Sequence, residues 1–208
     1  MVGPMSIRIA RGDVWTVTLD RPERANALSA DLVEALHDVL DEAADARPEA
    51  LVLRGNDRHF AAGFDLGGLG DETDASLAHR FLRVGLLLER LIAAPYRTVA
   101  VADGTAVGAG ADLVLACDHR LVDPAVTLRF PGSAFGVALG TVRRAELGSA
   151  LTTGVPASLA DVLRAEPPPR PPHDTDAELA ALARSVAVPG LRNRIAAYAA
   201  PVLTKETA

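Results

Sequence analysis

Two short glycine-containing segments constrain this chain more than any other feature. They are His-Phe-Ala-Ala-Gly-Phe-Asp-Leu at 59–66 and Asp-Gly-Thr-Ala-Val-Gly-Ala-Gly-Ala-Asp-Leu at 103–113. Each follows an apolar, strand-like run and reaches glycine or another small residue where we expect a helix to begin. A strand that ends in glycine and opens a helix leaves backbone N–H groups unpaired. Two such ends brought together would form a pair of donors for a developing negative charge, so the sequence predicts an anion held by backbone amides.

The composition excludes several classes of protein. The 208 residues suit one domain, and the 49% of apolar residues can build a substantial core. The net charge of −6 argues against nucleic acid as a partner. Cys117 is the single cysteine, so no intramolecular disulfide can form and a reducing compartment is expected. We predict a soluble, cytoplasmic protein in which Cys117 is a buried structural thiol.

The long, moderately hydrophobic run at 98–118 could be mistaken for a membrane span. Asp103, Asp112 and three glycines lie within it, which makes transfer into a bilayer costly. We therefore expect no association with the membrane.

Hydrophobic periodicity predicts alternating strands and helices. All-apolar strands that alternate with helices indicate an α/β domain with right-handed crossovers. The run Pro-Pro-Pro-Arg-Pro-Pro at 167–172 cannot be helical and marks a linker. The expected strands are 7–10, 14–19, 50–53, 98–102 and 119–122, and the expected helices are 30–44, 74–93, 110–116, 176–186 and 192–203.

Several kinds of site are absent from the sequence. The Gly108-Ala-Gly110 segment lacks the third glycine of a dinucleotide-binding fingerprint, because position 113 is Leu. No phosphate-binding P-loop and no Gly-x-Ser-x-Gly elbow occur, and the five histidines lack the spacing of metal ligands. Arginines at 21, 24, 54 and 58 lie close to the first glycine turn. They form either a solvated surface or a contact for a phosphate-bearing ligand.

Three motifs carry a resemblance to a known family. They are Arg21-Pro-Glu-Arg-Ala-Asn-Ala-Leu-Ser29, then Ala61-Ala-Gly-Phe-Asp-Leu66, then the 103–113 segment followed by Ala116-Cys-Asp118. In this order they resemble the enoyl-CoA hydratase/isomerase, or crotonase, superfamily, over roughly residues 7 to 140. The resemblance implies an α/β crotonase (ClpP-like) fold of repeated ββα units. The crotonase core would cover 1–145, and a short C-terminal helical region would cover 146–208.

The same resemblance implies a substrate and a way of binding it. The substrate would be an acyl-CoA thioester, with no cofactor other than the coenzyme A that it carries, and the assembly would be a homotrimer or a hexamer. In the family, two backbone N–H groups bind the thioester oxygen as it becomes an enolate; they map to Phe64 and Ala109. Contacts to coenzyme A or substrate map to Arg24, Ala25, Ala27, Ala61, Gly63, Asp65, Leu66 and Gly108.

The chain departs from the family at the proton-transfer residues. Family hydratases use two glutamates as acid and base; the first aligns with Asp112, and the second belongs in a Pro-Glu pair that is here Pro131-Gly132. Glycine cannot move a proton. Two hypotheses follow. One is an enzyme of the hydratase/isomerase type, a lyase or isomerase, that uses Asp112 or another residue; the other is an acyl-CoA-binding homologue with little or no activity. Double-bond isomerisation, decarboxylation and thioester hydrolysis share the same oxyanion requirement, so the motifs do not separate these reactions.

The remaining polar residues admit alternatives. Asp112 either stabilises its helix dipole while facing solvent or acts as a single acid/base at the substrate. Asp65 is expected to cap the helix after the first glycine turn, and Asp118 is expected to be structural. Asp71, Glu72 and His79 are either polar surface residues or residues that reach the acyl pocket. Arg129 and Arg143 either pair with carboxylates or line the entrance of the pocket.

Overall fold

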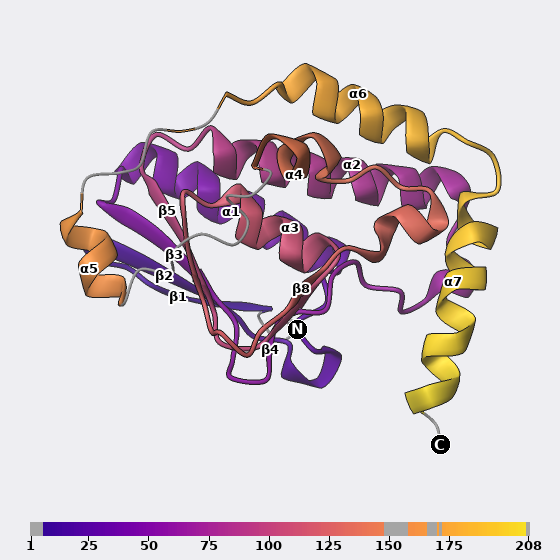
Figure 1. Cartoon of the computed structure of the whole chain (residues 1–208), viewed down its shortest axis with the longest axis horizontal. Helices are drawn as coiled ribbons and strands as arrows, with labels where there is room; N and C mark the ends of the chain where they lie inside the picture. The colour runs from indigo at the N-terminus through magenta and orange to yellow at the C-terminus, as the bar shows by residue number, and fades with distance from the viewer. Residues whose placement is uncertain (1–5, 148–157, 166–169, 171, 207–208) are drawn as a thin grey trace.

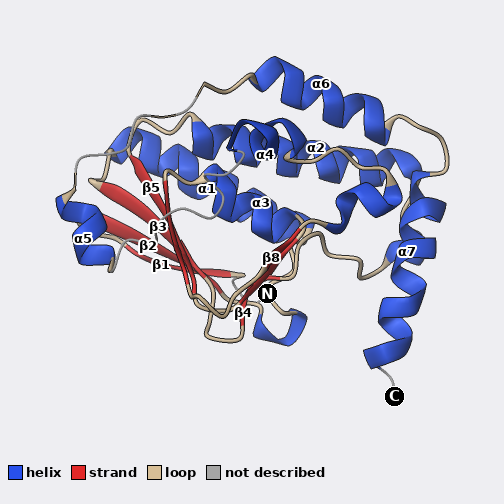
Figure 2. Ribbon diagram, viewed as in Figure 1, coloured by secondary structure: helices blue, strands red, loops and turns tan. Residues whose placement is uncertain are grey.

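Two sheets meet at an angle beneath a layer of helices (Figures 1 and 2). A computed structural model describes residues 6–147, 158–165, 170 and 172–206. The larger sheet has the order β1-β2-β3-β5-β7, in which β1 is antiparallel to β2 and the other pairs are parallel. Its strands are β1 (Ile7–Ala10), β2 (Val14–Leu19), β3 (Ala50–Arg54), β5 (Arg97–Ala102) and β7 (His119–Val122).

The smaller sheet was not predicted from the sequence. It has the parallel order β4-β6-β8 and consists of β4 (His59–Ala61), β6 (Thr105–Val107) and β8 (Leu128–Arg129). Each of its strands follows a strand of the larger sheet and precedes a helix: α2 (Asp74–Ile92), α3 (Ala109–Ala116) and α4 (Thr141–Leu147), respectively. The expected repetition of ββα units is therefore confirmed. Because β4 and β6 are hydrogen-bonded neighbours, the segments that follow them lie side by side.

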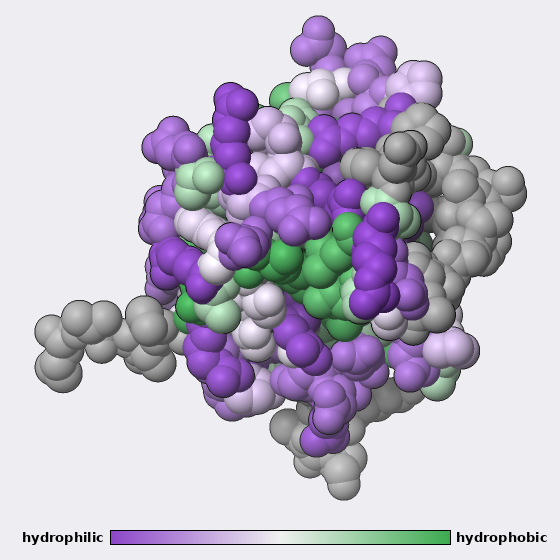
Figure 3. All heavy atoms as spheres, turned by 90° about the vertical axis from the view of Figure 1, so that its left-hand side faces the viewer, coloured by the Kyte–Doolittle hydropathy of each residue, from purple (hydrophilic) through white to green (hydrophobic). Residues whose placement is uncertain are grey.

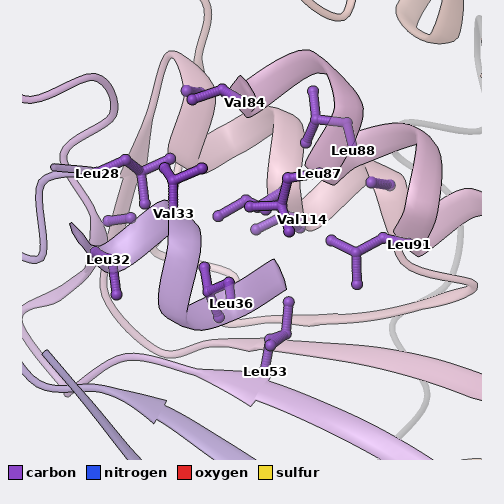
Figure 4. Packing of buried hydrophobic residues seen from close by; sticks show 14 of the residues in the cluster. Leu28, Leu32, Val33, Leu36, Leu53, Val84, Leu87, Leu88, Leu91 and Val114 are labelled. Carbon is purple, nitrogen blue, oxygen red and sulfur yellow. The ribbon is translucent and has the colours of Figure 1, made fainter. Parts of the chain in front are cut away.

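The core lies between the larger sheet and the first two long helices. Helix α1 (Ala30–Ala46) begins at the predicted cap Ser29, whose hydroxyl accepts from the Leu32 amide. Its apolar face meets α2 and β3, and Figure 4 shows Leu36 facing Leu53. Leucine, valine and alanine build most of this core, as the low aromatic content requires. These contacts fix α2, which forms one wall of the cavity described below.

Helices from the C-terminal part of the chain pack on the helix layer and on the opposite face of the larger sheet. Helix α6 (Thr175–Val186) lies along α2, where a Cβ at Gly85 would come within 2.5 Å of Leu182. Helix α5 (Leu159–Arg164) covers part of the opposite face of the larger sheet, where Val162 joins Val52 and Val99. At that end of the molecule an apolar area lies among polar side chains (Figure 3). Helix α7 (Leu191–Glu206) follows α6.

Two of the predicted segments need comment. Of the predicted linker 167–172, the structure describes Arg170 and Pro172, and neither is helical. The apolar run 98–118 folds as β5, β6 and α3, and no helix within the described residues has the length and apolar character that crossing a bilayer requires.

Candidate active site

A cavity of about 690 Å³ lies where the smaller sheet meets α2, α3 and α7. Its wall is mostly apolar, with a few polar groups that include Asp112, Arg129 and Arg144. This mixture is typical of a small-molecule site. The lining residues are Ala25, His59, Ala62, Gly63, Phe64, Leu66, Phe81, Thr105, Val107, Gly108, Ala109, Asp112, Arg129, Phe130, Pro131, Gly132, Phe135, Val137, Leu139, Arg144 and Tyr198.

The two glycine-containing segments lie against each other at this cavity. Gly63 has φ +91°, and a Cβ there would lie 2.5 Å from the Val107 carbonyl oxygen and 3.4 Å from the Ala109 nitrogen. A Cβ at Gly110 would collide with the Ala61 carbonyl oxygen. Only glycine permits so close an approach of the two backbones. The two segments are therefore in contact at the cavity.

The backbone N–H groups of Phe64 and Ala109 both lie where a regular backbone hydrogen-bonding pattern stops. Leu28 forms an isolated parallel bridge with Phe64, using the Gly63 carbonyl (2.7 Å) and the Asp65 amide (3.2 Å). In that pattern the N–H of Phe64 itself faces away from Leu28. Ala109 is the first residue of α3, so its N–H has no partner within the helix. Within the described part of the chain, neither amide donates a hydrogen bond to another backbone carbonyl.

Asp112 is a buried carboxylate on the cavity wall. It lies in the first turn of α3 with a side chain 5% exposed, so the alternative in which it faces solvent is wrong. Its Oδ1 lies 2.5 Å from Nη1 of Arg144, whose guanidinium lies 4.7 Å from the centre of the Phe130 ring. Arg144 was not among the candidates from the sequence; the neighbouring Arg143, which was, points to the Leu115 carbonyl instead. Nothing in the sequence shows which of two consecutive arginines faces a cavity.

The environment of Asp112 changes its acidity. Burial raises the pKa of its carboxyl to about 7, against the opposing attraction of the Arg144 guanidinium. The negative charge of Glu178 adds to the increase. A carboxyl with a pKa near neutrality can both accept and return a proton at physiological pH.

The arginines near the first glycine turn hold a second buried carboxylate. Asp65 is 2.9 Å from Arg21 Nη1 and 3.3 Å from Arg24 Nη2, and it accepts from the Gly67 amide at 2.8 Å. Burial alone would raise the pKa of Asp65, but these donors outweigh it and keep the pKa below its ordinary value. Asp65 does not cap a helix: α2 begins at Asp74, with Thr73 as its cap. The helix starts at Asp74, as the periodicity predicted, and a 3-10 turn at Leu69–Asp71 lies between Asp65 and its first residue.

The other candidates divide between the cavity and the surrounding structure. Arg129 lines the cavity, whereas Ala61 is fully buried beneath α3. Asp118 is structural, as expected: it accepts from Thr98 and pairs with Arg170. Cys117 is fully buried, also as expected. The cavity lining includes the candidates Ala25, Gly63, Phe64, Leu66, Gly108, Ala109, Asp112 and Arg129, and does not include Arg24, Ala27, Ala61, Asp65, Asp71, Glu72, His79 or Arg143.

The comparisons with known proteins agree on one family. A family model described as enoyl-CoA hydratase/isomerase matches residues 10–161. A Mycobacterium bovis protein named probable enoyl-CoA hydratase echA6 is 40% identical over 126 residues, which are 61% of this chain and 50% of that protein. A Homo sapiens protein named ethylmalonyl-CoA decarboxylase is 29% identical over 152 residues, which are 70% of this chain and 49% of that protein. The chain thus spans about half the length of these curated relatives.

A solved structure extends the similarity to almost the whole chain. The crystal structure of a Bordetella parapertussis protein named as an enoyl-CoA hydratase/isomerase superposes with a TM-score of 0.83 and 35% identity. The match covers 94% of this chain and 98% of that one. An enoyl-CoA hydratase from Bacillus anthracis superposes with a TM-score of 0.64 and 26% identity, over 69% of this chain and 58% of that one.

Proposed function

The chain belongs to the enoyl-CoA hydratase/isomerase family, and from that premise we propose that it is an enzyme that binds an acyl-CoA thioester and stabilises its enolate. Coenzyme A enters as part of the substrate, and the family resemblance supports a homotrimer or hexamer. The observation that carries the proposal is the meeting of the Phe64 and Ala109 segments at a cavity that also contains Asp112.

The two amides are suited to a thioester oxygen. When a proton leaves the α-carbon, the C–H electron pair moves to this oxygen, which becomes negative. Preorganised N–H donors stabilise that charge more than they stabilise the neutral carbonyl. One such donor contributes about 3–4 kcal/mol to the transition state. The role needs no particular side chain, so phenylalanine and alanine can both fill it.

Asp112 is the proposed proton carrier. As a carboxylate it would remove a proton from the α-carbon of the bound thioester, and as a carboxylic acid it would return the proton to the α- or γ-carbon. The raised pKa supports both halves of this cycle near neutral pH. Arg144 would hold the Asp112 carboxyl group in place through both steps.

The cavity favours one-carboxyl chemistry over hydration. Among the described lining residues, Asp112 is the one carboxylate. By the family resemblance, Gly132 would stand at the position of the second glutamate. Adding water across a double bond needs both an acid and a base at the substrate, whereas moving a double bond needs one group that carries a proton. We therefore infer proton transfer at an enolate, such as double-bond isomerisation, rather than ordinary hydration.

The coenzyme A portion is proposed to lie near the first motif. Arg24 is half exposed beside the loop that carries Gly63, and its guanidinium is within reach of a phosphate that approaches this edge. Positive charge and a bidentate donor geometry suit phosphate binding. The proposed contacts are Arg24, Ala25, Ala27, Ala61, Gly63, Asp65, Leu66 and Gly108.

Exchange of α-protons tests the proposal whatever product the enzyme forms. The protein is incubated with butyryl-CoA in heavy water, and deuterium incorporation is followed by mass spectrometry. We expect incorporation at the α-carbon, reduced by about 10²- to 10⁴-fold in Asp112→Asn. Asp118→Asn is the matched control, because Asp118 is similarly buried (6% against 5% exposed) and similarly paired with an arginine, but lies outside the cavity lining.

Two results would contradict the proposal. Binding of butyryl-CoA without any exchange would favour the second candidate, a non-catalytic acyl-CoA-binding protein, which the glycine at position 132 supports. Hydration of crotonyl-CoA is monitored as the loss of enone absorbance. Fast hydration that Asp112→Asn abolishes would show that one carboxyl group suffices for this reaction.

A further inference from the structure

The aromatic residues of this chain are concentrated on the cavity. The sequence contains five Phe, two Tyr and one Trp, and every Phe except Phe60 lines the cavity, together with Tyr198. The hydrophobic core elsewhere is built mainly from leucine, valine and alanine. Away from the cavity, Trp15, Phe60 and Tyr96 are the aromatic residues of that core. Five of the eight aromatic residues thus line one cavity, and a wall of this composition suits contact with another ring.

Four of these five rings form a connected series that leads away from the proposed thioester position. Phe64 and Phe81 are stacked, with centroids 3.9 Å apart and planes 10° apart. Phe81 and Phe135 are tilted at 6.4 Å, and Phe135 and Tyr198 are tilted at 5.0 Å. The series therefore begins at the residue whose amide is a proposed oxyanion donor and ends on α7.

The rings differ in how much of their surface is already covered. The Phe64 ring lies between Phe81 and the Arg80 guanidinium, which is 4.3 Å from its centroid. Phe81 is only 2% exposed. Phe135 and Tyr198 are half-buried and contribute to the cavity wall. Phe130 also lines the cavity, but the Arg144 guanidinium lies 4.7 Å from its centroid. Phe135 and Tyr198 are the described rings of the cavity wall that have neither a stacked ring nor a guanidinium over them.

We propose that the acyl group of the substrate carries an aromatic ring that packs against Phe135 and Tyr198. This inference rests on the proposed function, because it takes the thioester carbonyl to lie at the Phe64 and Ala109 amides. Aromatic pairs gain from tilted or offset contacts beyond the area that they bury. Phe135 and Tyr198 already adopt such a tilted contact with each other. An arylacyl chain would extend the same series.

The test compares two thioesters with the same number of acyl carbons. Binding of 3-phenylpropionyl-CoA, nonanoyl-CoA and free coenzyme A is measured by calorimetry. The straight alkyl chain has more apolar surface, so area alone favours nonanoyl-CoA. We expect 3-phenylpropionyl-CoA to bind more tightly. Phe135→Leu and Tyr198→Leu should each weaken its binding by about 2- to 12-fold relative to nonanoyl-CoA, from about 0.5–1.5 kcal/mol for each aromatic pair.

Tyr198→Phe is the matched control, because it keeps the ring and should keep the preference. Equal or tighter binding of nonanoyl-CoA by the unmodified protein would overturn the inference. A preference for 3-phenylpropionyl-CoA that survives both leucine substitutions would overturn the assignment to these two rings. If neither thioester binds more tightly than free coenzyme A, the proposed function itself fails, and this result is distinct from a preference for the alkyl chain.

Discussion

The Arg144 guanidinium holds the Asp112 carboxylate at 2.5 Å, within a cavity wall where that carboxylate is 5% exposed. Two contacts fix this geometry. The Phe130 ring lies beneath the guanidinium, and Gly140 packs against both charged groups, because a Cβ there would collide with Asp112 Oδ1 and lie 3.0 Å from Arg144 Nη1. The ion pair and its supports make Asp112 a group whose charge depends on its surroundings, and the first two predictions follow from this dependence.

Removing the cation should shift the pH dependence of proton exchange. Burial raises the pKa of Asp112 and Arg144 lowers it, so Arg144→Gln leaves the effect of burial unopposed. We expect the pKa of Asp112 to rise above about 7. The acidic limb of the plot of exchange rate against pH should then move to higher pH. Proton exchange should be lost at pH 7 and partly recovered in alkaline buffer. Arg170→Gln, which removes the partner of Asp118, should leave the profile unchanged.

The same carboxyl should make folding stability depend on pH. The pKa of Asp112 is about 7 in the folded chain, against an ordinary value of 3.8 that applies when the chain is unfolded. The folded state therefore binds the extra proton and loses stability as pH rises between these values. Comparing Asp112→Asn with the unmodified protein by urea unfolding at pH 4.5 and 7.5 isolates this contribution. The variant should gain about 3 kcal/mol relative to the unmodified protein between the two pH values. If the unfolding free energies of the variant and the unmodified protein differ by the same amount at both pH values, the raised pKa of Asp112 is contradicted.

Gly140 should be irreplaceable for two separable reasons. It has φ +63°, and an added Cβ would collide with Asp112. Gly190 has φ +78° but open space around it, so Gly190→Ala measures backbone strain alone. We expect Gly190→Ala to cost about 1–2 kcal/mol of unfolding free energy without affecting exchange. Gly140→Ala should cost more and also abolish exchange; equal costs and intact exchange in both variants would show that Gly140 does not position the ion pair.

Most of the larger sheet and its helices could be predicted from the sequence. The strands at 7–10 and 14–19 and the helix starting at Ala30 lie where alternation, helical spacing and Ser29 place them. The strands of the smaller sheet could not, because β4 and β6 have three residues each and β8 has two. The alternation of apolar and polar residues that identifies a strand cannot be recognised over two or three residues. Their register is set by pairing between segments far apart in the chain.

Only part of the cavity could be predicted, because several of its residues also come from segments far apart in the chain. Glycines 63, 108 and 110 predict a close approach of two backbones, and the structure brings their segments together. Arg144, Phe135 and Tyr198 come from segments whose position depends on how the later helices pack. The prediction that Asp65 caps a helix is wrong: a carboxylate after a glycine turn suits that role, but two arginines from the first motif pair with it instead.

A crystal structure of the protein with bound butyryl-CoA tests the central claim most directly. The quantities to measure are the distances from the thioester oxygen to the amide nitrogens of Phe64 and Ala109. We predict that both lie at about 2.7–3.1 Å, with Asp112 facing the α-carbon. A thioester oxygen that accepts from neither amide, in a fully occupied complex, would contradict the account.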